Sequence, residues 1–284
     1  MKLARMDERF GLVADDRFVD LQKVGLGTFD VTSNAIFEAW DELRAAVESL
    51  DPGLLQSSSV PLDHQKLGPP VGYPRQIFAL ALNYADHSAE AGISPPEYPL
   101  VFAKYPSCLT GPGNPIELGS NRVDWEVELV VVIGRGGLAI AEDDGWAAVA
   151  GLTVGQDLTD RRVQFRKPMP HFSMAKSTPT YGPLGPVLVS TDEFDDANDL
   201  SIRCQINGEV VQDSRTSQLV FSVPRLVAEI SSTVRLLPGD AIFTGTPAGV
   251  GSSRDPRRYL APGDEIVSVI EGIGSMHNVC RERH

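Results

Sequence analysis

Short apolar runs and one helix-like run fill the first 70 residues of the chain. The segments KLARM, RFGLVA and RFVDL place apolar side chains between charged turns, which predicts three short strands. Apolar side chains then recur every three or four positions from Ile36 to Leu50, which predicts a helix. Ser33 or Asn34 is expected to cap the start of this helix, and Asp51-Pro52-Gly53 is expected to end it.

The pattern changes after residues 67–74, which are rich in proline and glycine and are expected to form a linker. From there, strands are expected in the runs IFALALNY, PLVFAKY, EVELVVVIG, AGLTVGQDL, GPVLVS, LSIRCQING, AIFTGTPAG and EIVSVIEG. Helices are expected only over residues 143–150 and 221–236. Because regular helices do not separate the strands, a doubly wound parallel sheet is disfavoured. We therefore expect a small domain over residues 1–70 and a larger, sheet-rich domain over residues 71–284.

Composition fits an ordinary globular protein and narrows the possible partners. Of the 284 residues, 42% are hydrophobic and 22% are charged, so a sizeable core is feasible. The net charge of −13 arises from 25 Lys and Arg against 38 Asp and Glu, and a surface this acidic repels phosphate backbones. We therefore expect no nucleic-acid partner, and an acidic cytosolic enzyme is the plainest interpretation of the charge.

The cysteines and apolar runs bear on the cellular compartment. Cys108, Cys204 and Cys280 lie far apart without a CxxC pair, which argues against a zinc knuckle or a disulfide framework and fits a reducing compartment. Charged residues interrupt the first ten positions, so no signal peptide is predicted. The densest apolar stretch, Leu129–Gly134, is far too short to cross a bilayer. We expect a cytoplasmic protein with no membrane partner.

Two glutamates at the start of an apolar run carry the most specific chemical signal. Glu126 and Glu128 lie two positions apart among strong strand formers, so on a strand they would share a face, roughly 6.5–7 Å apart. Two such carboxylates repel each other unless a positive group lies between them. Asp157 follows the next predicted strand and could reach the same cation; three carboxylates without histidine or cysteine favour Mg²⁺ or Mn²⁺ over zinc. The alternative is that one glutamate faces solvent on an edge strand.

A histidine and a lysine are candidates for acid–base and electrostatic roles. His87 and Glu90 lie three positions apart, so on a helix they share one face and can hydrogen-bond. A carboxylate that orients an imidazole makes a general base near neutral pH, able to take a proton from water. Alternatively, the pair is an ordinary surface contact. Lys176 lies in a loop between polar turns, where it could stabilise negative charge on oxygen or simply be solvated.

Further polar residues are candidates for binding a substrate. Arg161 and Gln164 come soon after Asp157 and could reach a substrate carboxylate or carbonyl. The glycine-rich run FTGTPAGVG lacks the GK[ST] ending of a phosphate-binding loop, yet its amides and Thr246 could bind a carboxylate. A tight turn is the alternative for this run, and surface charge alone is the alternative for Arg162.

Taken together, these motifs resemble those of the fumarylacetoacetate hydrolase family. The resemblance is specific because nine strings between about residue 75 and residue 280 follow the order usual for the family. They are LNYADHSAE, FAKYPSCLTGPGNPI, VDWEVELVVVIG, GQDLTDRRVQ, AKS, PLGP, INGEVVQ, LLPGDAIFTGTPAGVG and PGDEIVSVIEGIG. Two features depart from the family pattern. Arg162 stands where the family often has an acidic residue, and the loop QFRKPMPHFSM has its own composition.

The resemblance implies an α+β fold that is mainly β, with a mixed β-roll behind a small α+β N-terminal domain, and a homodimer as the usual assembly. It also implies a role for each candidate residue. The family's ligands for Mg²⁺ or Mn²⁺ are matched by Glu126, Glu128 and Asp157. Its water-activating dyad and its oxyanion-stabilising lysine are matched by His87, Glu90 and Lys176. Its substrate-facing positions are matched by Arg161, Gln164 and Thr246.

The same resemblance implies chemistry on a small-molecule keto acid. The expected substrate is a 2,4-diketo acid such as an acylpyruvate, which water cleaves at a carbon–carbon bond to pyruvate and a carboxylic acid. The same metal site could instead serve a decarboxylase, or an isomerase or tautomerase of keto dioic acids of the oxaloacetate or 2-hydroxyhepta-2,4-diene-1,7-dioate type. A third possibility is a member that keeps the fold for binding alone, against which the retained metal and catalytic residues argue.

Overall fold

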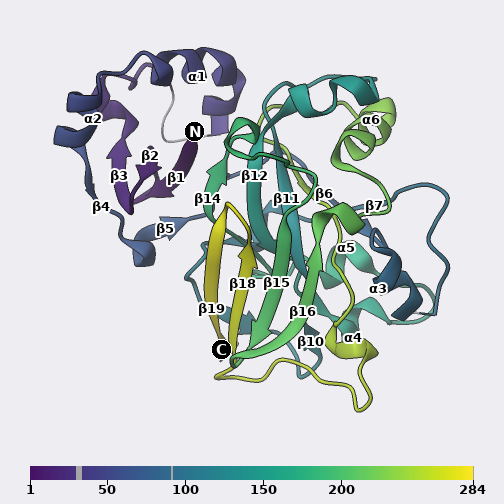
Figure 1. Cartoon of the computed structure of the whole chain (residues 1–284). Helices are drawn as coiled ribbons and strands as arrows, with labels where there is room; N and C mark the ends of the chain where they lie inside the picture. Colours follow the sequence, from purple (N-terminus) through teal and green to yellow (C-terminus); the bar gives the residue numbers. More distant parts are fainter. Residues whose placement is uncertain (30–33, 91, 284) are drawn as a thin grey trace.

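One long mixed sheet runs through both parts of the chain (Figure 1). The structure is a computed structural model and describes residues 1–29, 34–90 and 92–283. The strands of the long sheet are β1 (Lys2–Met6), β2 (Arg9–Ala14), β3 (Arg17–Asp20), β4 (Val60–Pro61), β5 (Leu67–Gly68), β6 (Ile77–Ala81), β7 (Leu100–Ala103), β8 (Leu109–Thr110), β11 (Val127–Ile133), β12 (Val149–Gln156), β14 (Gly182–Val189) and β17 (Ala241–Phe243). Their order is β4-β3-β2-β1-β14-β12-β11-β17-β6-β7, with β5 paired to β1 and β8 paired to β14.

A second sheet packs against the middle of the long one. It contains β9 (Ile116–Leu118), β15 (Ser201–Ile206), β16 (Glu209–Arg215), β18 (Glu265–Ile270) and β19 (Gly274–Glu282), in the order β16-β15-β18-β19-β9. A separate short pair is formed by β10 (Val123–Asp124) and β13 (Thr159–Asp160). Side chains of both large sheets share the main core cluster, where Leu129 and Leu152 join Ile202 and Ile266. The expected fold, mainly β with mixed sheets, is confirmed.

The central strand β11 is buried on both faces. Leu129 and Val131 belong to the core between the two sheets, whereas Val130 and Val132 belong to two smaller clusters on the other face. Successive side chains of a strand alternate between its faces, so positions 126 and 128 continue the set that contains Val130 and Val132. Two acidic side chains therefore extend an otherwise apolar row, which sets them apart chemically.

Few helices accompany the sheets in the described part of the chain. They are α1 (Trp40–Glu48), α2 (Pro52–Ser58), α3 (Ala85–Glu90), α4 (Arg161–Gln164), α5 (Phe172–Ala175) and α6 (Val223–Thr233). The helix predicted within residues 221–236 is confirmed by α6. None of the helices in these residues has the length and hydropathy needed to cross a membrane.

The prediction of a helix over residues 143–150 is wrong. Two 3-10 turns, Glu142–Asp144 and Trp146–Ala148, stand there instead, and β12 begins at Val149. Val149 already pairs with Ile133 of β11, so the sheet takes residues that the helix would need. The alanines of this run favour a helix, but strand pairing outweighs that propensity.

The N-terminal strands are confirmed, but the predicted cap of the first helical segment is not. A 3-10 segment, Asn34–Ala39, leads into α1. Ser33 lies outside the described residues. Asn34 does not cap the helix, because its side chain is used elsewhere: Oδ1 accepts a hydrogen bond from Gly72 N at 2.9 Å.

The predicted stop at Asp51-Pro52-Gly53 has a second role. The helix α1 does end before it, but the same residues start α2. The side chain of Asp51 accepts a hydrogen bond from Leu54 N at 2.8 Å, and Pro52 takes the first helical position, where its missing N–H costs nothing. A strong stop signal can therefore be an equally strong start signal.

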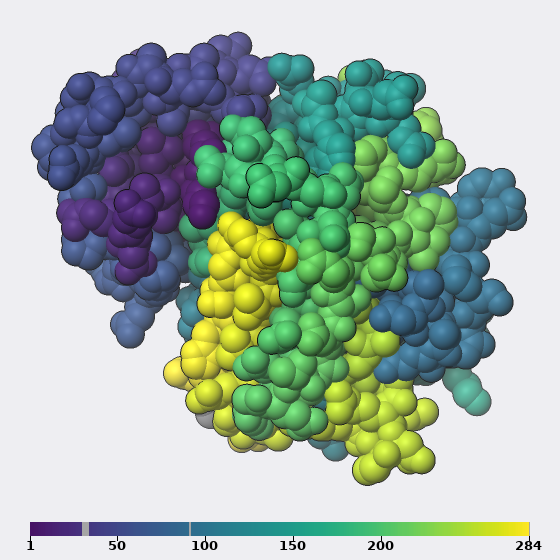
Figure 2. Space-filling view, viewed as in Figure 1, coloured from purple at the N-terminus to yellow at the C-terminus, as the bar shows by residue number. Residues whose placement is uncertain are grey.

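The long sheet joins the N-terminal residues to the rest of the chain. The strand β1 pairs with β14, with Leu3 opposite Leu188, and β5 falls within the expected linker and pairs with β1. Leu188 and Val132 also pack in one core cluster with Phe37 and Trp40. Figure 2 shows the N-terminal residues as a purple and blue lobe in direct contact with the remaining residues.

Candidate active site

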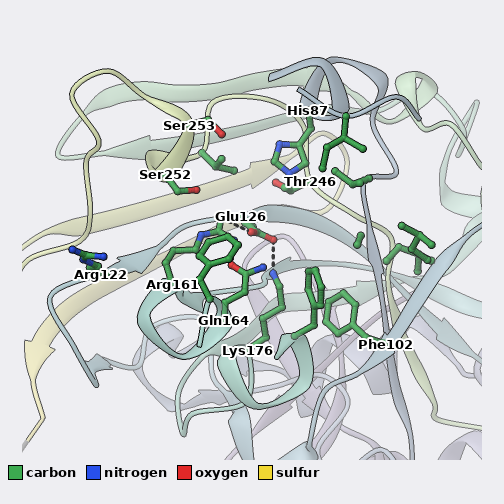
Figure 3. A pocket seen from close by; sticks show the side chains of 18 of the residues that line it. His87, Phe102, Arg122, Glu126, Arg161, Gln164, Lys176, Thr246, Ser252 and Ser253 are labelled. Atoms are coloured by element: carbon green, nitrogen blue, oxygen red, sulfur yellow. Dashed lines mark hydrogen bonds and ion pairs between the residues drawn. The ribbon is translucent and has the colours of Figure 1, made fainter. Parts of the chain in front are cut away.

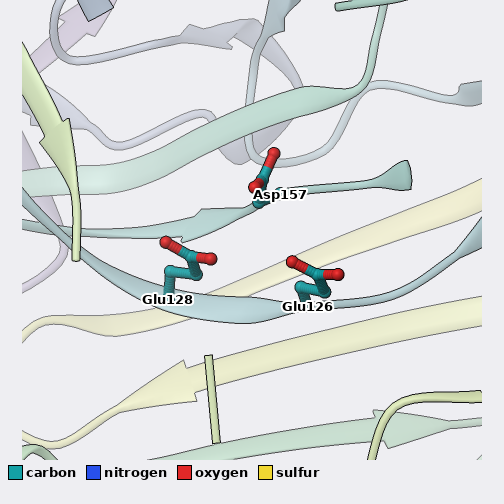
Figure 4. A group of neighbouring side chains, drawn as sticks. All are labelled: Glu126, Glu128 and Asp157. Carbon is teal, nitrogen blue, oxygen red and sulfur yellow. The ribbon is translucent and has the colours of Figure 1, made fainter. Parts of the chain in front are cut away.

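Three buried carboxylates meet where β11 and β12 pair. Glu126 directly precedes β11, Glu128 lies within it, and Asp157 directly follows β12. The antiparallel register brings them together, because Asp157 N donates to Glu126 O at 2.9 Å and Glu128 lies opposite Gly155. One carboxylate oxygen of each residue lies within 4.8 Å of the other two (Figure 4). The structure thus places all three predicted metal ligands in one cluster.

The close approach of the strands at this point depends on a glycine. A Cβ on Gly155 would lie 2.5 Å from Cγ2 of Val130 and 2.9 Å from Cε1 of Phe243. Both neighbours are buried in a close-packed core, where a side chain has little room to shift. The glycine therefore lets apolar packing continue directly beside the carboxylate cluster.

Two buried lysines partly neutralise the cluster. Lys176 Nζ donates to Glu126 Oε2 at 2.6 Å and to Asp157 Oδ2 at 2.7 Å. Lys104 Nζ donates to Asp157 Oδ1 at 2.7 Å and also to the carbonyl oxygen of Lys176. Burial opposes the charge of Lys104, but the neighbouring Asp157 outweighs it, and the pKa of Lys104 lies above its ordinary value. Each oxygen of Asp157 thus faces one ammonium group.

Arg161 is engaged by acidic groups of the protein itself. Its Nη2 lies 2.7 Å from Asp124 Oδ2 and 2.7 Å from Glu126 Oε1, and its Nη1 donates to Gln164 Oε1 at 2.8 Å. Burial would raise the pKa of Glu126, but Lys176 and Arg161 outweigh burial and lower it. The guanidinium predicted to bind substrate is therefore occupied by carboxylates on the protein side, while Gln164 keeps its amide N–H groups for another acceptor.

Glu128 carries the unpaired oxygen of the cluster. Its Oε2 accepts a hydrogen bond from Gly245 N at 2.8 Å, whereas Oε1 is buried and has no hydrogen-bond partner among the described residues. Burial, followed by the charges of Asp157 and Glu126, raises the pKa of Glu128 well above its ordinary value. A buried oxygen without a partner is costly, and a cation between the three carboxylates would remove that cost. This donor set of oxygens fits a hard cation such as Mg²⁺ or Mn²⁺.

His87 lines the same cavity from α3. Its Nδ1 lies 3.2 Å from Glu90 Oε2, and Glu90 Oε1 accepts a hydrogen bond from Gly249 N at 3.0 Å. The predicted dyad is thus formed, and Glu90 also ties α3 to the glycine-rich loop. Because Nδ1 is engaged, Nε2 is the nitrogen left for a ligand. In Figure 3, His87 lies above Glu126 and Lys176 lies below it.

Thr246 lies on the cavity wall, but its hydroxyl is used within the protein. Thr246 Oγ1 donates to Val127 O at 2.8 Å and accepts from Gln212 Nε2 at 2.8 Å. These bonds fix the glycine-rich loop beside the first residue of β11, so that Gly245 N reaches Glu128. The loop is irregular, with a bend at Ala248 in place of the tight turn that was one alternative, and it holds Glu128 of the cluster in place.

A cavity of about 570 Å³ opens above the cluster. Its described lining residues come from segments far apart in the sequence: residues 80–102, 122–126, 161–176 and 246–259. His87, Glu126, Arg161, Gln164, Lys176 and Thr246 all line it. The volume suits a small organic acid, and the perturbed pKa values of Glu126 and Glu128 mark its floor as a functional-site candidate.

Two buried residues of the site were absent from the sequence prediction. Lys104 ends the apolar run PLVFAK, yet it is only 1% exposed. Asp124 is fully buried and holds Arg161. A signal for Asp124 was present, because Asp124, Glu126 and Glu128 repeat an acidic residue at every second position of one strand-like run. A lysine after an apolar run is too common a pattern to have identified Lys104.

The chain is similar to known proteins. A family profile described as "Fumarylacetoacetate (FAA) hydrolase C-terminal" matches residues 76–281. The chain is 42% identical to human oxaloacetate tautomerase FAHD2A, mitochondrial, over 211 residues, which cover 74% of this chain and 67% of that protein. It is 39% identical to the fumarylacetoacetate hydrolase domain-containing protein 2 homolog of Dictyostelium discoideum, over 97% of this chain and 93% of that protein.

Solved structures are similar to this chain over its full length. A Mycobacterium smegmatis protein provisionally assigned as HpcE superposes with a TM-score of 0.93 at 45% identity, covering 100% of both chains. Maleylpyruvate hydrolase from Sphingobium sp. SYK-6, solved with manganese(II) and pyruvate, superposes with a TM-score of 0.82 at 29% identity, again over 100% of both chains. The chain belongs to the fumarylacetoacetate hydrolase family.

Proposed function

We propose that this chain is a metal-dependent tautomerase or isomerase, which moves a proton on the carbon next to the keto group of a 2-keto acid. The observation that carries this proposal is the position of His87, oriented by Glu90, in the same cavity as the carboxylate cluster. A base held by a carboxylate and facing a polar floor is what proton abstraction beside a carbonyl needs.

Glu126, Glu128 and Asp157 would hold the cation, which when bound supplies Lewis acidity toward a carbonyl oxygen. Lys176 keeps a positive charge beside Glu126 and Asp157, on the floor where negative charge develops on the substrate's keto oxygen. Lys104 secures the other oxygen of Asp157. These ion pairs set the floor of the site before a substrate arrives, which lowers the reorganisation needed during the reaction.

In the keto-to-enol direction, His87 takes a proton from the carbon beside the keto group, and the electron pair moves toward the keto oxygen. That oxygen then takes a proton from water, His87 releases its proton to water, and the reverse sequence regenerates the keto form. Glu90 stabilises the imidazolium while His87 carries the proton. Relatives support this reading over hydrolysis, since the human relative at 42% identity is named as an oxaloacetate tautomerase.

Cleavage of a carbon–carbon bond in a 2,4-diketo acid is the second candidate. His87 would then take a proton from water, and hydroxide would attack the distal carbonyl to release pyruvate and a carboxylic acid. A specific observation favours it: the similar structure of maleylpyruvate hydrolase was solved with manganese(II) and pyruvate. Decarboxylation of a keto dioic acid would use the same floor without an attacking water.

Product analysis distinguishes these reactions. The protein is incubated with oxaloacetate, an acylpyruvate and 2-hydroxyhepta-2,4-diene-1,7-dioate in the presence of Mg²⁺ or Mn²⁺. The proposal predicts faster keto–enol interconversion of a dioate, followed by its absorbance, with no loss of carbon. Pyruvate and an acid formed from the acylpyruvate would favour the hydrolase, and release of CO₂ would favour the decarboxylase. Glu128→Gln, which disrupts the cluster, is the control for protein-independent conversion.

We also propose a homodimer that forms along the edge of the long sheet. The edge strand β7 exposes Leu100 and Val101, and Tyr98 beside it is 59% exposed. An apolar sheet edge is prone to pair with another chain unless it is covered. Sedimentation equilibrium tests this: the wild type is expected at twice the monomer mass, and Val101→Glu is expected to shift it toward the monomer.

We propose a cytoplasmic location for this chain, as its composition indicates. The human relative is named as mitochondrial, so under this proposal the compartment differs within the family. Fractionation of source cells followed by immunodetection decides between the two outcomes.

A further inference from the structure

The wall of the cavity is more positive than the protein as a whole. Among the described lining residues, the cationic side chains are Arg122, Arg161, Lys176 and Arg257, and the one carboxylate is Glu126. The complete chain, by contrast, carries a net charge of −13. A cleft lined by one sign of charge concentrates ligands of the opposite sign. Which of these four cations can bind an anionic ligand depends on whether carboxylates of the protein already neutralise them.

Two of the four cations are already neutralised within the protein. Lys176 lies between Glu126 and Asp157, and Arg161 lies between Glu126 and Asp124. A substrate carboxylate would have to compete with these buried pairs, which is costly once the charges are desolvated. Neither cation is thus well suited to hold a second anionic group of a substrate.

The other two cations, Arg122 and Arg257, differ in this respect. No described residue forms an ion pair or hydrogen bond with the guanidinium of Arg122 or Arg257. The neighbours of Arg257 on its own loop differ, because Arg254 and Arg258 both pair with Glu209. Two guanidinium groups therefore remain available at the cavity wall, and each can contact a carboxylate in a forked geometry.

Hydrogen bonds hold the segments of these two arginines together. The buried Asp124 accepts hydrogen bonds from Gly251 N at 2.7 Å and from Ser252 N at 3.0 Å. Leu260 N donates to Val123 O at 2.9 Å. Residues 122–124 therefore run beside the loop that contains residues 251–260. The arginines come from two segments that the fold fixes to each other.

The two sides of the cavity differ in chemistry. In Figure 3, Arg122, Ser252 and Ser253 lie on one side of Glu126, and Phe102 lies on the other. The described apolar lining residues include Leu80, Leu82, Leu100, Phe102 and Phe172. An apolar wall gives no partner to a second charge, so a substrate with two anionic ends would be oriented by the arginine side.

We propose that Arg122 and Arg257, assisted by the hydroxyl groups of Ser252 and Ser253, form a subsite for a second carboxylate, and that the substrate is a keto acid with two carboxylates. The inference rests on the proposed function, in which the first carboxylate and the keto group lie at the carboxylate cluster. The arginine pair then selects keto dioates over keto acids with an uncharged tail.

Calorimetric binding to the Mn²⁺-loaded protein tests the subsite with a readout other than activity. The probes are two matched pairs, 2-oxoglutarate with 2-oxopentanoate and oxaloacetate with 2-oxobutanoate, in which a methyl group replaces the second carboxylate. The wild type is expected to bind the dioate of at least one pair about tenfold more tightly or better. Arg122→Gln and Arg257→Gln are each expected to weaken dioate binding about tenfold and to leave monocarboxylate binding unchanged. Arg235→Gln, which removes an exposed arginine outside the cavity, should change neither.

Equal affinity within both pairs would overturn the subsite, as would arginine variants that weaken both members of a pair alike, or a protein that binds none of the four probes. Turnover is scored separately. A dioate preference that depends on the arginines but comes without keto–enol conversion would leave the subsite standing and remove the proposed function. Keto–enol conversion without any dioate preference would leave the proposed function standing and remove the subsite. Where turnover occurs, Arg257→Gln should raise KM for the dioate with little change in kcat.

Discussion

His87 is the residue on which the proposed proton transfer depends. His87→Ala should lower kcat by roughly 10²–10⁴-fold, because it removes the base while leaving the three carboxylates in place. Metal affinity should stay near the wild-type value. His277→Ala, which changes an exposed histidine on β19, is the matched control. Steady-state kinetics and a metal titration of both variants check this, and an undiminished kcat in His87→Ala would exclude His87 as the base.

Lys104 stabilises the carboxylate cluster through its buried ion pair with Asp157. Lys104→Met keeps the length of the side chain but removes the ammonium from Asp157 Oδ1, in a setting where both partners are buried. The free energy of unfolding of the metal-free protein should fall by roughly 2–4 kcal/mol, since a buried carboxylate loses one of its cations. Lys66→Met, which breaks an exposed pair with Asp7, should cost less than about 1 kcal/mol. Urea denaturation measures both, and equal losses would contradict this account.

At the residue scale, the sequence identified the cluster but not the pairing inside it. Glu126 and Glu128 were recognisable because acidic residues rarely alternate at the start of a buried strand, and Asp157 followed the next strand. The partners of Arg161 could not be read, because they depend on where Asp124 lies in space. A charged side chain in the sequence is equally compatible with solvent, a ligand or a buried partner. Only the fold shows that Arg161 is paired, while Arg122 and Arg257 have no ion-pair partner among the described residues.

The substitution Gly155→Ala tests how closely β11 and β12 must approach each other for the carboxylate cluster to bind a metal. Gly155→Ala would place a Cβ 2.5 Å from Val130 Cγ2 in a buried region of β12, directly opposite Glu128. Overpacking of this kind should lower the free energy of unfolding by about 1–3 kcal/mol and should also weaken metal binding. Gly113→Ala, whose new Cβ would meet only His64 O at 3.5 Å, should change both little. Thermal unfolding and metal titration report the result; unchanged metal affinity in Gly155→Ala would show that the strands need not approach so closely.

Elements with a strong local pattern were predictable, and those decided by distant partners were not. The amphipathic α6 carries its own signal, with Ser222 as a capping residue and Pro224 in the first turn. The run from Asp143 to Ala150 has alanines typical of a helix, but pairing with β11 and contact with α6 decide its structure. Strand order in the long sheet is likewise set by contacts distant in sequence, such as β1 with β14, which periodicity does not encode.

The whole molecule is expected to unfold as one cooperative unit. Leu188 of β14 packs in a cluster with Leu3 and Phe37 from the N-terminal residues, so Leu188→Ala creates a cavity at their shared core. The cost should be roughly 2–5 kcal/mol, with circular dichroism and tryptophan fluorescence reporting the same lowered midpoint. Val210→Ala, at a half-exposed position, is the control. Two separate transitions, with only the first one shifted, would show that residues 1–70 and 71–284 fold independently.

At the scale of the whole molecule, an acidic protein surrounds a cavity that has four cationic side chains among its described lining residues and that reaches the carboxylate cluster at Glu126. Composition alone indicated only the first of these facts, and the expectation that the protein does not bind phosphate backbones stays a prediction. The local reversal of charge arises from segments as far apart as Arg122 and Arg257. Net charge is a sum over the surface, so it contains no information about such a reversal.

The central claim is that Glu126, Glu128 and Asp157 together hold one divalent cation. Calorimetric titration of Mn²⁺ into the metal-free protein tests it most directly, with Glu128→Gln beside the wild type and Glu117→Gln, at an exposed position of β9, as the control. The account predicts one site per chain in the wild type and in Glu117→Gln, and at least about tenfold weaker binding in Glu128→Gln. Wild-type binding that is absent, or that survives unchanged in Glu128→Gln, would contradict it.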